Sequence, residues 1–387
     1  MNDRDVVIVE AVRTAVGRRN GSLSGVHPVP LLAQVLREVM RRAGLSPDLV
    51  EDVVCGCVDQ VGEQAANVGR NALLTAGFPY TIPATTLDRQ CGSGQQAVHF
   101  AANLVQAGVC DVTIGCGVEN MSRVPILSSF QNGPGFPFPP ELVERYALTS
   151  QGIAAEEIAT KWSIGRQDVD RFAYESHMKA ARAREEGRFR REITPVQVTL
   201  EGVETVFEHD EGIRPDSNLE KLATLQPSFR EDGIHTAGNS SQISDGAAAV
   251  LLMPVAKARE LGVKPRARIV AQAVVGSDPV LMLTGPMTAT PRVLEKAGLK
   301  LEEIDLIEIN EAFASVVLAW EKELRPDMRK VNVNGGAIAL GHPLGCTGAK
   351  LMTTLLHELE RTGGRYGLQT MCCGGGLGTA TVIERLD

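Results

Sequence analysis

Residues 43–53 read AGLSPDLVEDV, and residues 297–307 read AGLKLEEIDLI, at an offset of 297 − 43 = 254 positions. The same offset places the tetrapeptide CGSG at 91–94 on GCTG at 345–348. In both places a helical stretch follows, and then a strand that ends in glycine or cysteine. An offset shared across roughly fifty residues predicts two copies of one α/β unit, with equivalent loops facing each other. Chance similarity between two α/β units is the alternative that this pattern leaves open.

Short apolar runs alternate with helical patterns along the chain, and this alternation predicts an α/β fold with a largely parallel sheet. The strand-like runs are residues 6–9, 53–55, 112–114 and 248–253, and the helical stretches include 31–42 and 95–106. Residues 120–245 break the alternation, which predicts an insertion in the first copy. We therefore expect an N-terminal half at 1–119 and 246–266, an inserted loop domain at 120–245 and a C-terminal half at 267–387.

Composition limits the classes of partner. The 387 residues include 39 Lys and Arg against 47 Asp and Glu, a formal net charge of −8, so we expect no nucleic acid and no membrane surface as partner. No apolar run approaches the ~18 residues of a membrane span, and the charged N-terminus does not resemble a signal peptide, so we expect a cytoplasmic protein. The eight cysteines are sparse, and no histidine pair has zinc-site spacing, so we expect reduced thiols and no metal.

Cys91 follows a strand-like approach and precedes a helix, with small neighbours on its C-terminal side. The positive end of a helix dipole lowers a thiol pKa, so we expect a depressed pKa and an accessible nucleophile here. Three further groups stand in equivalent loops: His342 in a Gly-His-Pro turn, the run CCGGG at 372–376, and Asn310 with Glu311 after an acidic apolar strand. The glycine run fails the spacing of a phosphate loop, but its bare backbone amides could approach an oxyanion.

Together these motifs resemble the thiolase family of coenzyme A dependent acyltransferases over nearly the whole chain. The matching motifs, in order, are VEAVRT at 9–14, CGSG at 91–94, ENMS at 119–122, TAGN at 236–239, NEAF at 310–313, GHP at 341–343 and CCGGG at 372–376. The resemblance implies the thiolase fold: two duplicated α/β halves with central mixed sheets covered by helices, in five αβαβα layers, plus the inserted loop domain.

The resemblance also implies roles for individual residues. Cys91 would be the acylated nucleophile, His342 its proton acceptor, and Cys372 the acid and base at the α-carbon of the leaving acetyl group. Asn310 would fix a water that forms one oxyanion hole with His342, and the backbone amides of Cys91 and Gly374 would form the other. The implied reaction is degradative cleavage of a 3-oxoacyl-CoA, in which an acyl group passes through Cys91 to coenzyme A with release of acetyl-CoA.

Coenzyme A enters as a co-substrate, with no tightly bound cofactor. By position, Ser241 would contact its pantetheine arm and Arg214 its nucleotide end, although Arg214 also fits an ordinary surface arginine. Acyl-CoA and CoA are thus the expected partners, and the family resemblance suggests a homodimer or homotetramer.

Two departures bear on the substrate. Acetyl-specific biosynthetic thiolases typically have a His-Met pair where this chain has Ser150-Gln151, and the usual glycine after Ser241 is Gln242. We therefore expect a bulky or long acyl chain, and the loop resembles that of thiolases acting on steroid side chains. Four aromatic residues would form an apolar wall for it, or else pack within the loop or on a partner subunit: Phe130, Phe136, Phe138 and Tyr146.

Three alternative functions stay open on the sequence alone. One is a biosynthetic acetyl-CoA C-acetyltransferase that makes acetoacetyl-CoA. Another is a condensing enzyme like β-ketoacyl synthases, although these commonly use two histidines with the cysteine. The third is a non-catalytic acyl-CoA binding protein, which the intact reactive side chains disfavour.

Overall fold

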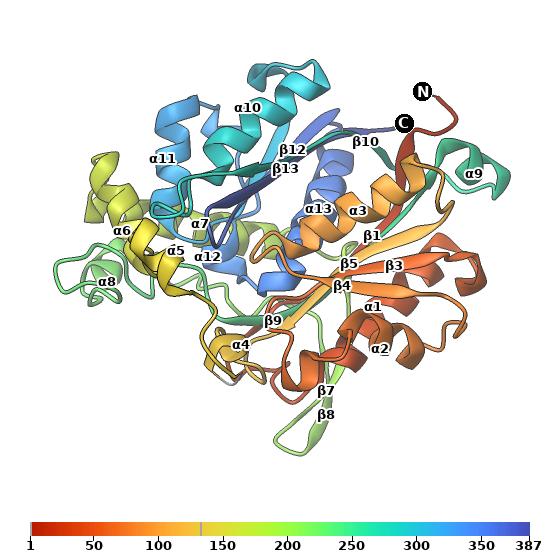
Figure 1. The fold of residues 1–387 in the computed structure, drawn as a ribbon, viewed down its shortest axis with the longest axis horizontal. Helices are drawn as coiled ribbons and strands as arrows, with labels where there is room; N and C mark the ends of the chain where they lie inside the picture. Colours follow the sequence, from red (N-terminus) through yellow and green to blue (C-terminus); the bar gives the residue numbers. More distant parts are fainter. Residues whose placement is uncertain (1, 132–133) are drawn as a thin grey trace.

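The computed structural model describes residues 2–131 and 134–387, whose strands form two half-sheets joined edge to edge (Figure 1). The first half-sheet has the strand order β1 (Val6–Thr14), β9 (Ser244–Pro254), β5 (Thr113–Asn120), β3 (Asp52–Gly56) and β4 (Ala84–Leu87). The second has the order β10 (Ala267–Gly276), β13 (Leu377–Arg385), β12 (Tyr366–Cys373) and β11 (Leu306–Ile309). β1 and β10 join the two through a short antiparallel pairing. Two short strands, β2 (Gly17–Arg18) and β6 (Ile193–Thr194), pair with β9 and β1.

The sheet is mixed, so the prediction of a largely parallel sheet is wrong. β3 is parallel to both of its neighbours and β11 to β12, but β9 and β13 run antiparallel to both of theirs. β13 follows β12 through a tight turn in which Gly375 and Gly376 have left-handed φ angles of +77° and +75°. The chain therefore reverses there without a crossover helix. β9 runs antiparallel to β5 because the chain leaves the sheet at the end of β5, forms the inserted segment and then comes back along β5.

Helices cover both half-sheets and also separate them, which gives the five αβαβα layers expected (Figure 1). α1 (Pro28–Ala43) and α2 (Val68–Thr75) lie on the first half-sheet, and α10 (Gly285–Ala297) and α11 (Ala314–Leu324) on the second. α3 (Ser93–Gln106) and α13 (Leu344–Thr362) lie between them and contact strands of both. Val98 and Leu356 are fully buried in this central layer, and each such side chain contributes about 1.5–3 kcal/mol.

The two halves repeat the same elements at the offset found in the sequence, which confirms the duplication. α1 ends at Gly44 with φ +67°, and α10 ends at Gly298 with φ +66°, both in the left-handed conformation that caps a helix. β3 follows the first cap as β11 follows the second. Where α3 and α13 cross, a Cβ on Gly94 would lie 2.6 Å from a backbone oxygen of α13, and one on Gly348 1.9 Å from a backbone nitrogen of α3. These equivalent glycines permit the close approach of the two central helices.

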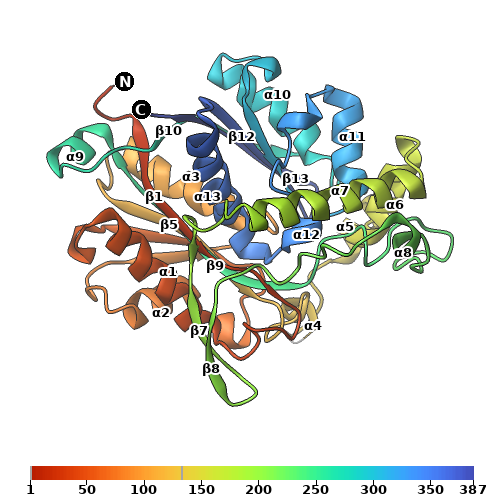
Figure 2. The same ribbon diagram turned by 180° about the vertical axis from the view of Figure 1, so that it is seen from behind.

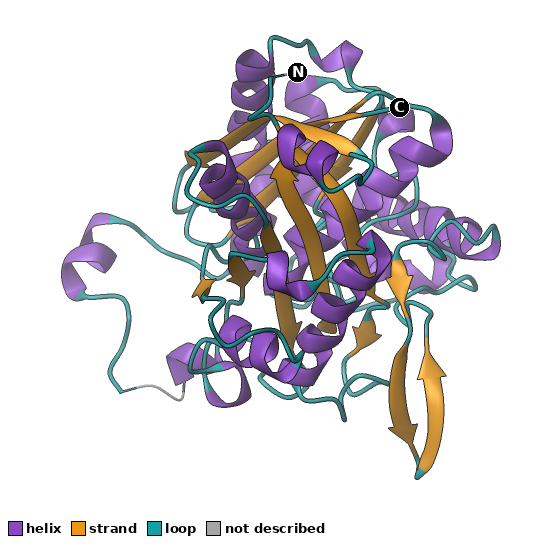
Figure 3. Ribbon diagram, turned by 90° about the vertical axis from the view of Figure 1, so that its right-hand side faces the viewer, coloured by secondary structure: helices purple, strands orange, loops and turns teal. Residues whose placement is uncertain are grey.

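The inserted segment leaves the sheet from β5 and returns on its neighbour β9. Their pairing ends at Asn120 and Asp245, where the predicted loop domain begins and ends; the boundaries themselves stay a prediction. Figure 3 shows the β7–β8 hairpin of this segment extending away from the body of the molecule. The elements of the segment are α4 (Ser128–Gln131), α5 (Pro140–Arg145), α6 (Gln151–Lys161), α7 (Arg166–Glu185), β7 (Val196–Leu200), β8 (Val203–Phe207) and α8 (Leu219–Ala223).

Two short helices complete the fold. α9 (Val255–Glu260) follows β9, and α12 (Ala337–Leu340) is a single turn just before α13. α7 of the inserted segment packs against α12 (Figure 2), so the insertion contacts the chain that leads into α13. Over residues 2–131 and 134–387, no helix is both long and apolar enough to cross a membrane.

Candidate active site

The four predicted catalytic side chains come from three loops and one strand. Cys91 precedes α3, Asn310 follows β11, His342 lies between α12 and α13, and Cys372 is near the end of β12. All four are buried, with exposed fractions between 0% and 3%. Cys91 packs in one cluster with Leu344 and Leu351 of α13 and Met371 of β12, which directly neighbours Cys372.

His342 is held as a neutral base by its hydrogen bonds. Its Nδ1 lies 2.6 Å from the hydroxyl of Thr347, which itself donates to the carbonyl of Pro343 at 2.8 Å. The hydroxyl therefore accepts from Nδ1–H, and Nε2 bears the lone pair. The amide nitrogen of Asn310 donates to this Nε2 at 3.4 Å. Burial, assisted by the charge of Lys350, lowers the pKa of His342 to about 3, so the ring is neutral at pH 7.

Asn310 lies directly beside His342 in the structure, and the water-filled oxyanion hole expected between them stays a prediction. The side-chain oxygen of Asn310 is buried and has no hydrogen-bond partner among the described residues. An unpaired buried oxygen is costly, and a bound water or substrate group that donates to it would remove that cost. This geometry favours the predicted oxyanion site beside His342.

The structure corrects the expectation for Cys91. Burial raises the pKa of Cys91 to about 11, although the backbone N–H groups of Gly374 and of Cys91 itself lower it. The side chain is only 3% exposed, so the thiol is neither depressed in pKa nor open to solvent. Desolvation raises the pKa more than the helix N-terminus lowers it, because the backbone amides replace only part of the hydration that a thiolate loses in this buried cluster. A nearby base is therefore needed to deprotonate it.

The backbone N–H groups of Gly374 and Cys91 are near enough to the Cys91 sulfur to lower its pKa, and their role as an oxyanion hole stays a prediction from the resemblance. Donors arranged in this way can stabilise an oxyanion that forms on the carbon attached to that sulfur. Two glutamines that the sequence reasoning did not place here lie beside Gly374: its Cβ would be 3.1 Å from both Gln90 Oε1 and Gln151 Nε2. In the sequence, Gln151 was indicated by the departure from the family's His-Met pair at Ser150-Gln151. Gln90 has a left-handed φ of +50° in the structure.

Both thiols of the Cys-Cys pair lie near Cys91. Burial and the neighbouring Cys91 raise the pKa of Cys372 well above its usual range, and the same causes raise the pKa of Cys373. Cys373 packs against α3, since a Cβ on Gly92 would lie 2.5 Å from its sulfur. Assignment of the acid–base role to Cys372 stays a prediction from the family resemblance.

The two predicted CoA-binding residues stand in different surroundings. Ser241 is half-buried, and its N–H donates to the carbonyl of Ala312 at 2.9 Å, two residues from Asn310. Arg214 is exposed, and its side chain makes no hydrogen bond or ion pair with the described residues. Its backbone N–H donates to Nδ1 of His177 at 3.2 Å. Ser241 is thus joined to a catalytic loop, and Arg214 presents a cation on the surface, where an anionic group can reach it.

The aromatic residues of the inserted segment pack on one another. Phe138 lies edge-on to Phe130 and to Phe136, with ring centroids 5.7 and 5.3 Å apart. Phe136 is 72% exposed and Tyr146 is 37% exposed. This packing within the loop agrees with the second of the two expected arrangements, and the acyl wall stays a prediction.

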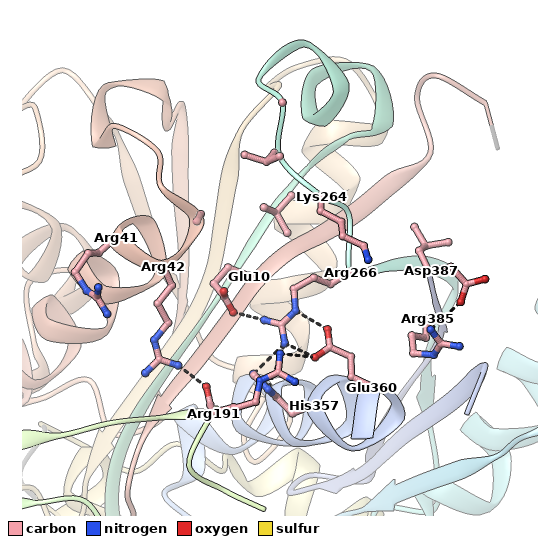
Figure 4. Close-up of a pocket in the computed structure, with 15 residues that line it drawn as sticks. Glu10, Arg41, Arg42, Arg191, Lys264, Arg266, His357, Glu360, Arg385 and Asp387 are labelled. Carbon is pink, nitrogen blue, oxygen red and sulfur yellow. Dashed lines mark hydrogen bonds and ion pairs between the residues drawn. The ribbon is translucent and has the colours of Figure 1, made fainter. Parts of the chain in front are cut away.

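A cavity elsewhere on the molecule is lined by more basic than acidic side chains, and ion pairs neutralise part of this charge (Figure 4). It has a volume of about 950 Å³ and lies near the C-terminus. Arg266 pairs there with Glu10 and Glu360, and Arg191 pairs with Glu360 as well. In the described parts of the chain, no cluster of three or more His, Cys, Asp or Glu side chains is placed to hold a metal ion.

Comparison with known proteins shows the family of the chain. The thiolase N-terminal domain model matches residues 6–256, and the thiolase C-terminal domain model matches residues 263–385. The steroid 3-ketoacyl-CoA thiolase FadA6 of Mycobacterium tuberculosis is 49% identical, over 99% of this chain and 94% of that protein. The 3-ketoacyl-CoA thiolase of Bacillus subtilis is 45% identical, over 98% of this chain and 99% of that protein.

A solved structure extends the comparison to three dimensions. The acetyl-CoA acetyltransferase of Bacillus anthracis superposes with a TM-score of 0.92 at 43% identity, over 99% of both chains. The fold predicted from the sequence is therefore confirmed. With both family models matched and relatives aligned from end to end, the chain belongs to the thiolase family of acyltransferases.

Proposed function

We propose that this thiolase cleaves 3-oxoacyl-CoA esters in the degradative direction through an acyl-enzyme on Cys91. The observation that supports this most directly is the neutral, hydrogen-bonded His342, whose unprotonated Nε2 lies at Asn310 and whose near neighbour in the chain, Leu344, packs in the cluster of Cys91. A thiol with a pKa of about 11 needs such a base to become a nucleophile at pH 7.

The residues divide the reaction into two steps. His342 Nε2 takes the proton of Cys91, whose sulfur attacks the 3-keto carbon; the bond between C2 and C3 then breaks. The electron pair remains on C2 as the enolate of acetyl-CoA, and the Cys372 thiol protonates it. Coenzyme A next gives its proton to the Cys372 thiolate and attacks the acyl group. Cys91 leaves as a thiolate and recovers its proton from His342.

The remaining donors stabilise the two oxyanions. The amides of Cys91 and Gly374 would hold the oxygen of the carbonyl that Cys91 attacks. A water fixed by Asn310, together with His342 once Nε2 is protonated, would hold the thioester oxygen of the enolate. Ser241 would contact the pantetheine arm of CoA, and Arg214 would meet its phosphates. The exposed, unpaired guanidinium supports this assignment of Arg214, because a nucleotide end is anionic and reaches the surface.

The test is direct detection of the acyl-enzyme by mass spectrometry after mixing with acetyl-CoA or a 3-oxoacyl-CoA. We expect an acyl adduct on the Cys91 peptide of the wild type and none after Cys91→Ala. Cys372→Ala should still accept an acetyl group from acetyl-CoA but should not cleave a 3-oxoacyl-CoA. Normal turnover by Cys91→Ala would contradict the mechanism, and full cleavage by Cys372→Ala would contradict that residue's role.

We propose a bulky or long acyl chain, such as a steroid side chain, as the substrate. Gln151 beside Gly374 and the 49% identity to a protein named a steroid 3-ketoacyl-CoA thiolase support this choice. The competing function is acetoacetyl-CoA synthesis, since a protein named acetyl-CoA acetyltransferase superposes closely. Turnover of short linear, long linear and sterol-derived 3-oxoacyl-CoA esters separates the two, and fastest turnover of acetoacetyl-CoA would refute our substrate.

We further propose a homodimer or homotetramer in the cytoplasm. β4 is the last strand of the first half-sheet and leads directly toward Cys91, so its free edge can pair with a second copy. All eight cysteines are buried free thiols, which agrees with a reducing compartment. Sedimentation velocity measures the oligomeric state, and a monomer at micromolar concentration would contradict the first proposal.

A further inference from the structure

Gln242 belongs to a short segment, residues 240–244, that touches both catalytic loops of the C-terminal half. At one end of the segment, Ser240 forms an isolated antiparallel bridge with Phe313, and the N–H of Ser241 donates to Ala312. At the other end, the hydroxyl of Ser244 accepts from the backbone N–H of His342 at 3.1 Å. The segment therefore connects the loop of Asn310 with the loop of His342.

The side chain of Gln242 contacts the helix that precedes His342. Its amide nitrogen donates to the carbonyls of Ile338 at 2.8 Å and Ala339 at 3.3 Å. Both carbonyls belong to α12, a single turn whose last carbonyl groups have no partner in a continuing helix. Gln242 thus supplies the C-terminal end of α12 with a side-chain donor, and the longer contact to Ala339 shares one of the two amide hydrogens.

The opposite end of α12 is held by a carboxylate. Oε2 of Glu311 accepts from the N–H of Ile338 at 3.2 Å and from the hydroxyl of Ser176 at 2.7 Å. A negative charge at the first turn and donors at the last turn both match the helix dipole. α12 is therefore fixed from both ends by side chains of other segments, although it is too short to be stable alone.

A second route joins Gln242 to His342 through the backbone. The hydroxyl of Ser244 donates to the carbonyl of Gln242 at 2.8 Å while it accepts from His342 N–H. Gly341 lets this contact form, because its Cβ would lie 2.4 Å from that hydroxyl and its φ is +94°. The side chain and the backbone of Gln242 together thus set the position of the His342 imidazole relative to Asn310.

The same amide also reaches the segment of Arg214. Its nitrogen donates to the carbonyl of Gly212 at 3.0 Å, two residues before Arg214, and Gln242 directly follows Ser241. We propose that Gln242 is a positioning residue that fixes His342 for catalysis by joining α12 to the two chain segments that flank the proposed CoA site. This inference rests on the proposed role of His342 as the base.

The test compares Gln242→Met, which keeps the length of the side chain but removes its donors, with wild type. We expect kcat to fall about tenfold while the KM for CoA changes less than about threefold, because the lost donors loosen α12, whereas Ser241 keeps its bond to Ala312 and Arg214 keeps its backbone bond to His177. Hydrogen exchange of peptide 337–346 should become faster. Gln242→Glu should lower kcat further, since a carboxylate faces three carbonyl oxygens.

The matched control is Gln34→Met, which removes a glutamine donor to the carbonyl of Pro195 far from the site and should leave kcat and exchange unchanged. Gln242→Ala provides a second variant without a bulky replacement, in case Gln242→Met does not fold. Unchanged kcat in the folded Gln242 variants would overturn the inference, as would a fall in kcat without faster exchange at 337–346. Turnover by Cys91→Ala would instead refute the proposed function, and the exchange data would still report whether Gln242 holds the segment.

Discussion

Replacement of Thr347 by valine tests whether His342 works as the neutral base described here. The change keeps the shape of a fully buried side chain and removes one hydroxyl. That hydroxyl accepts from Nδ1–H of His342 at 2.6 Å and donates to the carbonyl of Pro343 at 2.8 Å. Without it, Nδ1–H is a buried donor with no partner, or the proton moves to Nε2 and faces the donating amide of Asn310.

The expected loss follows from the cost of one unpaired buried donor, about 1–3 kcal/mol. If this whole cost falls on the tautomer of His342 that reacts, kcat should fall roughly 5- to 150-fold, because each 1.36 kcal/mol is a tenfold change in rate. Binding of CoA does not involve this contact, so its KM should stay nearly constant. Steady-state thiolysis of a 3-oxoacyl-CoA measures both constants, and Thr347→Ser, which restores the hydroxyl, should recover most of the rate.

Thr353→Val is the matched control on the same helix. Its hydroxyl lies about 1.7 turns further along α13 and donates to the carbonyl of Ala349 at 2.9 Å. This variant should lose stability comparably but keep its kcat. The reasoning about His342 is refuted if Thr347→Val retains kcat within threefold of wild type, or if Thr353→Val loses as much activity.

Four further outcomes test other parts of the structure. The rate of alkylation of Cys91 by iodoacetamide, followed by peptide mass spectrometry, should rise about tenfold per pH unit from pH 7 to 9, because its pKa is about 11; a plateau at pH 7 would disprove the raised pKa. Gly348→Ala should lower the melting temperature strongly, since its Cβ would lie 1.9 Å from a backbone nitrogen, whereas Gly25→Ala, with nothing within 4 Å, should change little. His99 is buried and its pKa is lowered to about 3, so the unfolded state binds a proton at a higher pH than the folded state does. The free energy of unfolding, measured with urea, should therefore fall as the pH drops from about 6.5 toward 3. His99→Gln should make this pH dependence weaker, and the same pH dependence in both proteins would contradict the expectation. Arg214→Ala should raise the KM for CoA roughly 3- to 10-fold, with kcat unchanged and the difference shrinking at high salt; an unchanged KM would remove Arg214 from the CoA site.

Much of the fold was predictable because its signals are local. The repeat at an offset of 254 appears in the structure as equivalent helix caps at Gly44 and Gly298 and as equivalent crossing points at Gly94 and Gly348. A left-handed cap and a close helix crossing both require glycine at one position, so they leave a mark in the sequence. The direction of β9 and β13 leaves no such mark, because it depends on which neighbour each strand meets.

The motifs also identified the family and the loops that meet at the site. They did not determine the state of Cys91, because the helix N-terminus is a local feature and burial is not. The pKa of this thiol is set by side chains of α13 and β12, which reach it from the opposite end of the chain. The packed core therefore decides that the pKa of Cys91 is raised and not lowered.

The sequence by itself determined the family, the duplicated architecture and the reactive residue types, since each is written in short motifs and their spacing. Only the tertiary structure decided how those residues are supported. The tautomer of His342 depends on Thr347 and Asn310, and the position of its loop depends on Gln242, which is a hundred residues away in the chain. Hydrogen bonds between such distant segments form only after the core has brought them together, so no local pattern can predict them.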